Sequence, residues 1–232
     1  DIDAGEIGRW ARTDIALWGD AREGLIDLTN ALSEDAAKLQ ASRAQYITDI
    51  NAGKKKWRHE VDARLTSSEK PINMARLCHE LNNILPEDAI LVGDGGFAAH
   101  WTGLLYDTKR AGRGYIVDRG MAAIGYGVAG GMGAQLAAPD RPVFTLTGDG
   151  GLNMTLGDLE TAARLKLPLT VMVVNNAASG YVKALQHVMF GGHYQSADLS
   201  DLNYANVAKT LGCNSIRVEE PDGLAAALKS GL

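Results

Sequence analysis

The chain has 232 residues, of which 46% are hydrophobic and 22% charged, and its formal net charge is −5. That size and composition suit one folded domain with its own core, or one domain and part of another. The mild acidity gives no electrostatic reason to expect nucleic acid or an anionic membrane as partner, and no apolar run reaches the roughly 18–20 residues of a membrane span.

The cysteines and basic residues are typical of an intracellular protein without a metal site or a basic binding patch. Cys78 and Cys213 are far apart and lack the spacing of a metal site, so we expect buried or half-buried free thiols in a reducing compartment. The one dense basic run, 54–56, is flanked by acids, which is typical of a solvated helix. No signal peptide opens the sequence, and we predict a cytoplasmic protein.

The first 70 residues predict few regular elements. Asp1-Ile2-Asp3 has the pattern of a strand end, and the leucines of 25–32 indicate an amphipathic helix. Residues 34–70 are polar and predict a helix and a linker. Because the sequence starts without methionine and stops in a helical pattern at 222–232, we expect it to be part of a longer chain.

From Pro71 onward, predicted helices alternate with short apolar strands. A helix is predicted over 73–85, before Pro86, a glycine-rich helix ends near 138, and another helix spans 156–165. Strands are predicted at 89–92, 115–117, 143–146, 169–174 and 215–218. Apolar strands alternating with helices indicate an α/β fold, a mostly parallel sheet with helices on both faces, which binds ligands beyond the carboxyl ends of its strands.

Asp149 and Asn176 lie just past the ends of two such strands that one helix connects. Strands joined this way are parallel and usually neighbours, so their ends lie roughly 5–10 Å apart. Magnesium prefers oxygen ligands and shares its coordination with phosphate. The nearby glycines let the backbone approach an anion, and the helix after Asn176 directs its N-terminus there. The pattern predicts a magnesium–diphosphate site; the alternative is that both residues only cap turns and helices.

Gly148-Asp149-Gly150 followed by Asn175-Asn176 resembles the signature of thiamine-diphosphate enzymes. Further stretches are similar to the acetolactate synthase branch: 152–154, 167–168, Gly180, 92–101, 125–127 and 1–8. The resemblance covers nearly the whole chain. It implies that 1–33 end a central α/β domain, that 34–70 are helix and linker, and that 71–232 form the thiamine-diphosphate-binding domain without its last strand.

The resemblance also implies roles for individual residues. The side chains of Asp149 and Asn176 and the carbonyl of Ala178 would bind Mg²⁺. Ala122 would grip the aminopyrimidine ring through its backbone, and Ile124 would support the bent form of the cofactor. The other implied cofactor contacts are Gly96, Phe97, Ala98, Gly148, Gly150, Gly151, Gly180 and Tyr181, of which Phe97 and Ala98 replace polar residues and offer only backbone groups.

The implied activity is that of a thiamine-diphosphate- and Mg²⁺-dependent carbon–carbon bond enzyme, a lyase or transferase acting on a 2-keto acid or related small carbonyl substrate. The activating glutamate of the family belongs to a preceding domain, and family sites form between subunits of homodimers or homotetramers. We therefore expect these 232 residues to contain no catalytic residue and to be inactive alone. Leu185 replaces a tryptophan of acetohydroxyacid synthases, while His100, His187 and His193 are expected in loops or at the surface.

Two other hypotheses compete with this one. A catalytically inactive structural or regulatory subunit would share the fold, but it would have no need for the metal ligands that are present here. A dinucleotide-dependent oxidoreductase would explain Gly125-x-Gly127-x-x-Gly130, yet no strand directly precedes that motif, and more glycines follow it. A helix packed closely through its glycines explains the motif better. The sequence does not decide the substrate, or whether FAD or an acyl-CoA also binds.

Overall fold

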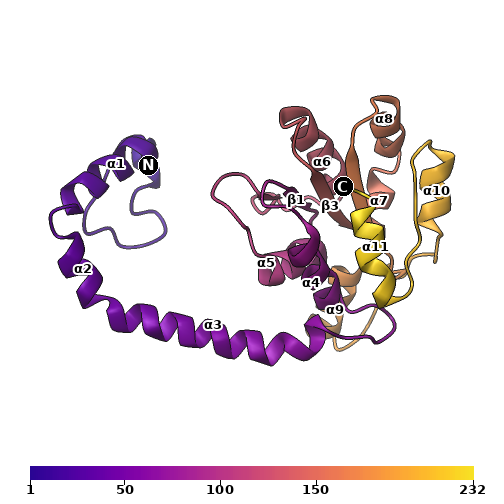
Figure 1. The fold of residues 1–232 in the computed structure, drawn as a ribbon, viewed down its shortest axis with the longest axis horizontal. Helices are drawn as coiled ribbons and strands as arrows, with labels where there is room; N and C mark the ends of the chain where they lie inside the picture. The colour runs from indigo at the N-terminus through magenta and orange to yellow at the C-terminus, as the bar shows by residue number, and fades with distance from the viewer. The chain divides into compact units, whose positions relative to one another are not determined.

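The computed structural model describes residues 1–232, which form two compact units, residues 1–60 and residues 61–232 (Figure 1). The long helix α3 (Ala44–Leu65) contributes residues to both units. The sequence-based domain boundaries at residues 33 and 70 remain predictions.

Unit 1 consists of helices without a buried core. Besides α3 it contains the 3-10 helix η1 (Ala4–Glu6), α1 (Ala21–Leu32) and α2 (Ala36–Ser42). The predicted amphipathic helix is α1, which begins after Asp20 because that side chain accepts hydrogen bonds from the backbone N–H groups of Arg22 and Glu23. None of the residues of α1 is buried, so its leucines remain exposed.

The strand predicted at Asp1–Asp3 is not formed. Asp1 shares only two hydrogen bonds with the segment 17–19, one from its amino terminus to Leu17 O (3.2 Å) and one from Gly19 N to Asp1 O (3.0 Å). Two bonds at one residue do not make a ladder, and Asp3 instead caps η1 by accepting from Gly5 N.

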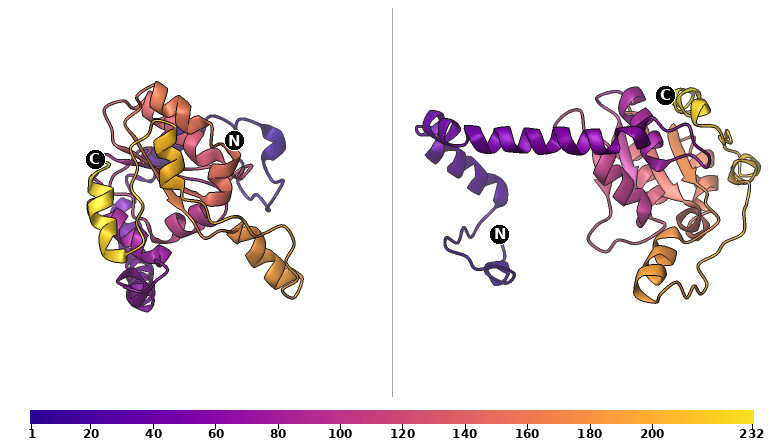
Figure 2. Two further views of the ribbon diagram at one scale, coloured as in Figure 1. Left: turned by 90° about the vertical axis from the view of Figure 1, so that its right-hand side faces the viewer. Right: turned by 90° about the horizontal axis from the view of Figure 1, so that it is seen from below.

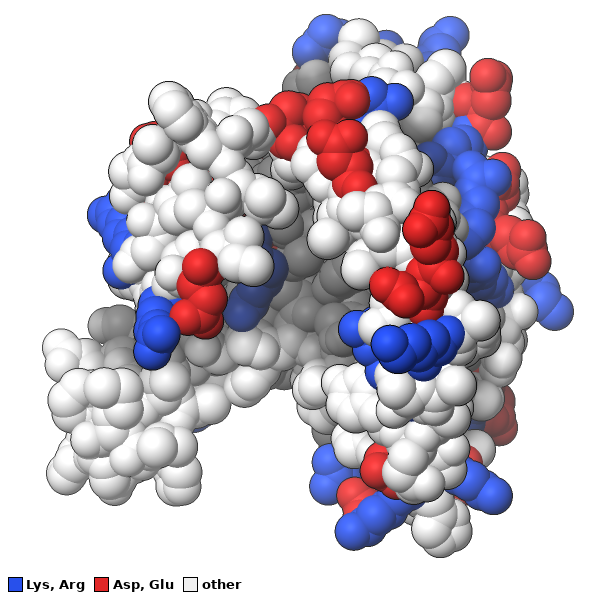
Figure 3. Space-filling view, turned by 90° about the vertical axis from the view of Figure 1, so that its left-hand side faces the viewer, with Lys and Arg blue, Asp and Glu red and all other residues white.

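The basic run 54–56 lies on the exposed surface of α3, as predicted, and Lys56 forms an ion pair with Glu60 at 3.9 Å. Figure 3 shows basic and acidic side chains interspersed over one face of the molecule. No helix in the structure combines the length and the hydrophobicity that crossing a membrane requires.

The centre of unit 2 is a four-stranded parallel sheet in the order β2-β1-β3-β4 (Figure 2). Its strands are β1 (Ile90–Gly93), β2 (Tyr115–Val117), β3 (Val143–Gly148) and β4 (Leu169–Val174). The predicted α/β fold with a parallel sheet is therefore confirmed. The order makes β3 and β4 neighbours and pairs Gly148 with Val174 at their carboxyl ends.

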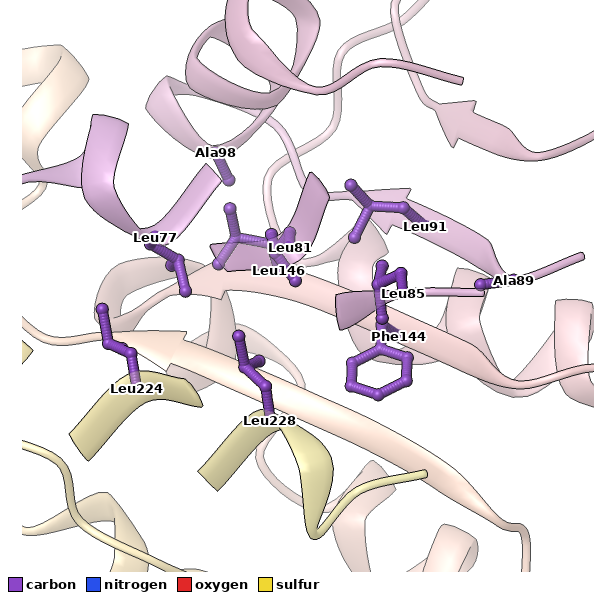
Figure 4. Close-up of a cluster of buried hydrophobic side chains, with 10 residues drawn as sticks. All are labelled: Leu77, Leu81, Leu85, Ala89, Leu91, Ala98, Phe144, Leu146, Leu224 and Leu228. Atoms are coloured by element: carbon purple, nitrogen blue, oxygen red, sulfur yellow. The ribbon is translucent and has the colours of Figure 1, made fainter. Parts of the chain in front are cut away.

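Alternate residues of each strand pack against different helix layers. Leu91, Phe144 and Leu146 contribute to one core, which α4 (Met74–Ile84), α5 (Phe97–Leu105) and α11 (Leu224–Lys229) cover, as Figure 4 shows. The other face packs against α6 (Tyr126–Ala137), through residues that include Ile90, Val92, Ala134 and Val143. Helices thus cover both faces of the sheet.

The remaining helices surround the sheet ends. They are α7 (Asp149–Met154), α8 (Asp158–Arg164), α9 (Gly180–Met189), α10 (Tyr204–Thr210) and η2 (Pro221–Gly223). The strand predicted at 215–218 is absent: the segment is irregular, pairs with no strand, and leaves Ile216 61% exposed. Two β-branched residues that alternate with polar ones suffice for the pattern, but a strand also needs a hydrogen-bonded neighbour.

Both cysteines are free, with Cys78 buried and Cys213 half-buried, which confirms the prediction for their thiols. Cys78 is a buried residue of α4, and its burial raises the pKa of its thiol to about 12.

The core shared by α4, α5 and α11 predicts a large effect for Leu81→Ala. Leu81 is 0% exposed, so the truncation should leave a cavity and lower the free energy of unfolding by about 2–5 kcal/mol. Leu104→Ala is the matched control on α5, because Leu104 is 60% exposed and its loss should change stability by no more than about 0.5 kcal/mol. Urea denaturation measures both, and equal effects would contradict the described core.

Candidate cofactor site

The carboxyl ends of β3 and β4 place the predicted metal-binding residues next to each other in the fold. Asp149 directly follows β3, and Asn175-Asn176 directly follow β4. Since the two strands pair in parallel and end level with each other, the predicted adjacency of their ends is confirmed. Whether Asp149 and Asn176 bind a metal remains a prediction.

Asp149 is a buried carboxylate, 2% exposed, in the first turn of α7. Its Oδ1 accepts from the N–H of Gly150 (2.8 Å) and its Oδ2 from the N–H of Ala178 (3.2 Å). Hydrogen bonds from N–H groups and the N-terminal end of a helix stabilise a buried negative charge. Asp149 therefore connects the end of β3 to the loop that follows β4.

The two asparagines have different surroundings. Asn175 fixes the loop: its Oδ1 accepts from Ala177 N (3.2 Å), and its Nδ2 donates to Asp201 Oδ1 (2.9 Å) and Leu202 O (3.0 Å). Asn176 is exposed, and its Nδ2 lies 3.0 Å from where a Cβ on Gly180 would be. Asn175 thus maintains the turn, while the side chain of Asn176 faces the start of α9.

A segment without any predicted element supports this loop. Residues 197–199 run antiparallel to 177–179, with Ser179 N donating to Ala197 O and Leu199 N donating to Ala177 O, both at 2.8 Å. Ala178 and Ala197 are buried by this pairing. The contact joins residues about twenty positions apart, and neither segment forms a regular strand. No local sequence pattern therefore predicts it.

The N-termini of α5 and α9 meet beside the asparagine loop. Gly96, with φ +66°, precedes α5, and Ser179 precedes α9; neither helix has a side-chain cap for its first N–H groups. A Cβ on Gly96 would lie 3.6 Å from Tyr181 Cβ, and one on Gly180 would lie 3.6 Å from the ring of Phe97. Free N–H groups at helix N-termini form a setting for an anion.

A cavity of about 440 Å³ adjoins these N-termini, lined by Phe97, Asn176, Ala178, Gly180, Lys183, Ala184, His187, Val188 and Tyr194. Figure 2 shows α9 projecting from the body of unit 2. Consistent with this, Val188, Met189 and Phe190 near its end are exposed.

Of the histidines predicted for loops or the surface, His187 and His193 are exposed, whereas the prediction is wrong for His100, which is half-buried within α5. His100 stacks on Tyr181 (ring centroids 5.2 Å apart) beside Phe97, and Nδ1 of the exposed His187 is 2.8 Å from Tyr194 Oη. His193 is exposed in the loop after α9. Ala98 packs into the core on α5, so only its backbone faces away from that core.

The segment 118–125 connects β2 to α6 and holds the predicted ring-binding residues. Ala122 has a left-handed backbone, φ +56°, which Asp118 supports by accepting from the N–H groups of Ala122 (3.3 Å) and Ala123 (2.9 Å). The side chain of Ile124 is 39% exposed, so Ile124 is not an ordinary core isoleucine. No strand directly precedes Gly125, which removes the structural context of a dinucleotide motif.

Gly127 of that motif and the following Gly131 instead allow α6 to pack closely. A Cβ on Gly131 would lie 3.1 Å from Leu169 Cδ1, and one on Gly127 would lie 3.0 Å from Asp94 Cβ. The predicted glycine-packed helix is confirmed.

Asp94, which follows β1, is a site residue that was not predicted from the sequence. It is 1% exposed; its Oδ1 accepts from the N–H groups of Gly95 (2.7 Å) and Gly125 (2.9 Å), and its Oδ2 accepts from the hydroxyl of Thr147. Asp94 follows an apolar strand, with Gly93 before it and Gly95 and Gly96 after it. Asp149 has the same glycine neighbours after its own strand, so the same pattern could have predicted Asp94.

The fold and these strand-end loops are those of an α/β cofactor-binding domain. Residues 94–232 match the family model described as "Thiamine pyrophosphate enzyme, C-terminal TPP binding domain", thiamine pyrophosphate being another name for thiamine diphosphate, and the chain belongs to this family. The resemblance to thiamine-diphosphate enzymes of the acetolactate synthase type is thereby confirmed.

The relatives have several different activities. The chain is 27% identical to the putative thiamine pyrophosphate-containing protein YdaP of Bacillus subtilis (100% of this chain, 39% of the relative). It is 26% identical to the large subunit of acetolactate synthase isozyme 3 of Escherichia coli (100% and 40%) and 28% identical to pyruvate oxidase of Lactiplantibacillus plantarum (97% and 36%). The chain thus spans about two fifths of the length of these relatives.

A solved structure shares the fold. The thiamine diphosphate-dependent 4-hydroxybenzoylformate decarboxylase of Rhodococcus jostii RHA1 superposes with a TM-score of 0.66 at 26% identity, over 72% of this chain and 31% of that one.

The close packing around Asp94 predicts that Gly151→Ala is destabilising. A Cβ on Gly151 would lie 2.7 Å from Thr147 Oγ1 and closer still to Asp94 Oδ2, so the buried side chains must shift. We expect the free energy of unfolding to fall by about 1–3 kcal/mol. In the control Gly157→Ala the new methyl group meets open space, so stability should be unchanged or slightly raised. Thermal denaturation compares the two, and equal melting temperatures would contradict the described packing.

Proposed function

We propose that this chain binds thiamine diphosphate through Mg²⁺ at the carboxyl ends of β3 and β4, as part of an enzyme that makes or breaks a carbon–carbon bond next to a carbonyl group. The single observation that carries the proposal is the buried Asp149, which is held between α7 and Ala178 beside the two uncapped helix N-termini. The family to which the chain belongs supports the choice of cofactor.

The residues present suit the cofactor and its metal. Asp149 and Asn176 would supply a carboxylate and an amide oxygen to Mg²⁺, with the carbonyl of Ala178 as the third protein ligand, and phosphate would complete the oxygen coordination. Both oxygens of Asp149 accept only one hydrogen bond each, which leaves lone pairs for a cation. The open N–H groups before α5 and α9 would receive the diphosphate.

The contacts around the diphosphate are mostly backbone contacts. Gly96, Phe97 and Ala98 begin α5, and Gly180 and Tyr181 begin α9, so all five can offer N–H groups at helix starts. Gly148, Gly150 and Gly151 form the turn around Asp149. Ala122 and Ile124, in the strained segment before α6, would hold the aminopyrimidine ring.

When bound, thiamine diphosphate supplies an electron sink for bond cleavage beside a carbonyl. The names of two similar proteins contain 2-keto acids, pyruvate and 4-hydroxybenzoylformate, which supports a 2-keto acid or a related carbonyl compound as substrate. The class of reaction we propose is that of a lyase or transferase. The geometry does not favour a dinucleotide-dependent activity, because Gly127 packs α6 against Asp94 and Gly131 packs it against β3.

Further parts of the proposal concern the whole protein. The glutamate that activates the cofactor in this family has no counterpart assigned among these residues, so activity would need a neighbouring domain, and we propose a cytoplasmic homodimer or homotetramer. A catalytically inactive subunit of the same fold is the second candidate. The presence of the complete Asp149–Asn176 pair favours the active enzyme over it.

Calorimetric titration of thiamine diphosphate into the full-length protein tests the site. With Mg²⁺ we expect saturable binding, and EDTA should abolish it because the diphosphate is held through the metal. Loss of an outer-shell partner alone weakens metal sites about 10–100-fold, so Asp149→Asn, which removes a ligand charge, should weaken cofactor binding at least about 100-fold.

The control for charge and shape is Asp140→Asn, which neutralises an exposed aspartate in the loop after α6 and should leave the dissociation constant unchanged. Absence of binding to the wild-type protein, or equal affinity in Asp149→Asn, would contradict the proposed function.

A further inference from the structure

Asp94 connects three segments that the proposed function assigns to three different parts of the cofactor. Its Oδ1 holds Gly95, at the start of the loop before α5, and Gly125, at the end of the segment that contains Ala122 and Ile124. Its Oδ2 holds the hydroxyl of Thr147, two residues before Asp149. One carboxylate thus joins the diphosphate loop, the ring-binding segment and the metal-binding strand end.

The backbone around Asp94 is too tightly packed for these segments to move independently. The three atoms nearest to a Cβ on Gly127 all belong to Asp94, and a Cβ on Gly151 would overlap its Oδ2. A Cβ on Gly95 would lie 3.1 Å from Ala122 O, which places the diphosphate loop directly against the ring-binding segment. Small displacements of Asp94 must therefore be transmitted to its neighbours.

The hydrogen bonds of Asp94 are also difficult to replace. The side chain is 1% exposed, so water cannot substitute for it, and its loss would leave the N–H groups of Gly95 and Gly125 without their acceptor. Gly125 adopts φ +97°, which glycine tolerates without strain. Its N–H group is buried, however, and still needs a hydrogen-bond acceptor.

We infer that Asp94 is a positioning residue, which fixes the distance between the ring-binding segment and the metal–diphosphate end and so determines how the two rings of thiamine diphosphate lie relative to each other. The inference rests on the proposed function. Asp94 touches neither cofactor nor metal in this role; it acts through Gly125 and Thr147. A merely structural aspartate would affect stability alone.

The test compares a whole cofactor with its diphosphate end. In Asp94→Ala we expect the dissociation constant of thiamine diphosphate to rise at least about 10-fold, because hydrogen bonds to a charged group are lost. Binding of inorganic pyrophosphate with Mg²⁺ should weaken less than binding of thiamine diphosphate, since Asp149 and the start of α9 keep their own hydrogen bonds while the ring-binding segment loses its link to them. Asp94→Asn keeps an oxygen for both N–H groups and should restore most of the affinity for thiamine diphosphate.

A second measurement reports the ring geometry directly. The exchange of the thiazolium C2 proton with solvent deuterium, followed by proton NMR after acid quenching of the holoenzyme, depends on how the aminopyrimidine lies against the thiazolium ring. At saturating cofactor we expect it to slow about 100-fold in Asp94→Ala, the size of effect that a misplacement of about 1 Å produces. Unchanged exchange, or an equal loss of thiamine diphosphate and pyrophosphate binding, would overturn the inference.

A pair of glycine substitutions keeps the inference testable if Asp94→Ala does not fold. Gly127→Ala leaves the carboxylate intact but presses on it, since the new Cβ lies 3.0 Å from Asp94 Cβ and Gly127 O is held by the hydroxyl of Thr145 at 2.8 Å. Gly133→Ala makes the same change in the same helix, where the new methyl group meets nothing within 4 Å.

We expect C2-proton exchange to slow about 10-fold in Gly127→Ala and not in Gly133→Ala, because only the first displaces Asp94. Equal exchange rates in the two variants would overturn the inference. Failure of the wild-type protein to bind thiamine diphosphate at all would instead refute the proposed function, so the two failures are distinguishable.

Discussion

Two buried carboxylates at the carboxyl edge of one parallel sheet hold the loops of this domain together. Asp94 follows β1 and Asp149 follows β3, and each accepts hydrogen bonds from a loop that belongs to another strand. Without water to solvate them, both depend on these N–H donors, and the donors depend on them. The paired β1, β3 and β4 fix where the strand ends lie, and the carboxylates then fix the loops relative to those ends.

Much of this arrangement was predictable because it follows from patterns within single segments. The apolar runs at 143–146 and 169–174 predict two strands, and the rule for strands joined by one helix makes them parallel neighbours. The sequence therefore predicts that Asp149 and Asn176 lie at the same edge of the sheet, at the carboxyl ends of these strands. The glycines after Gly125 likewise predicted a closely packed helix, since they continue beyond any dinucleotide motif.

What the sequence did not reveal depends on contacts between distant segments. Asp94 stands in the same kind of position as Asp149, but its partners, Gly125 and Thr147, are 31 and 53 residues away. The support of the asparagine loop by 197–199 has no regular pattern either. At 215–218 the local pattern is typical of a strand. Whether a strand forms depends on a neighbouring strand, and four residues alone do not predict such a neighbour.

Ala122 and Ala177 have one further consequence for ligand association. Each has a left-handed backbone, at φ +56° and +51°, a conformation that costs a residue with a Cβ about 1–2 kcal/mol. Asp118 and Asn175 hold these two turns in place. Because hydrogen bonds within the chain hold these unfavourable conformations, a molecule bound beside either turn would lose little entropy to ordering it. Glycine at either position would relieve the backbone strain, but it would also allow the loop more conformations. The loop would then be less preorganised for a ligand.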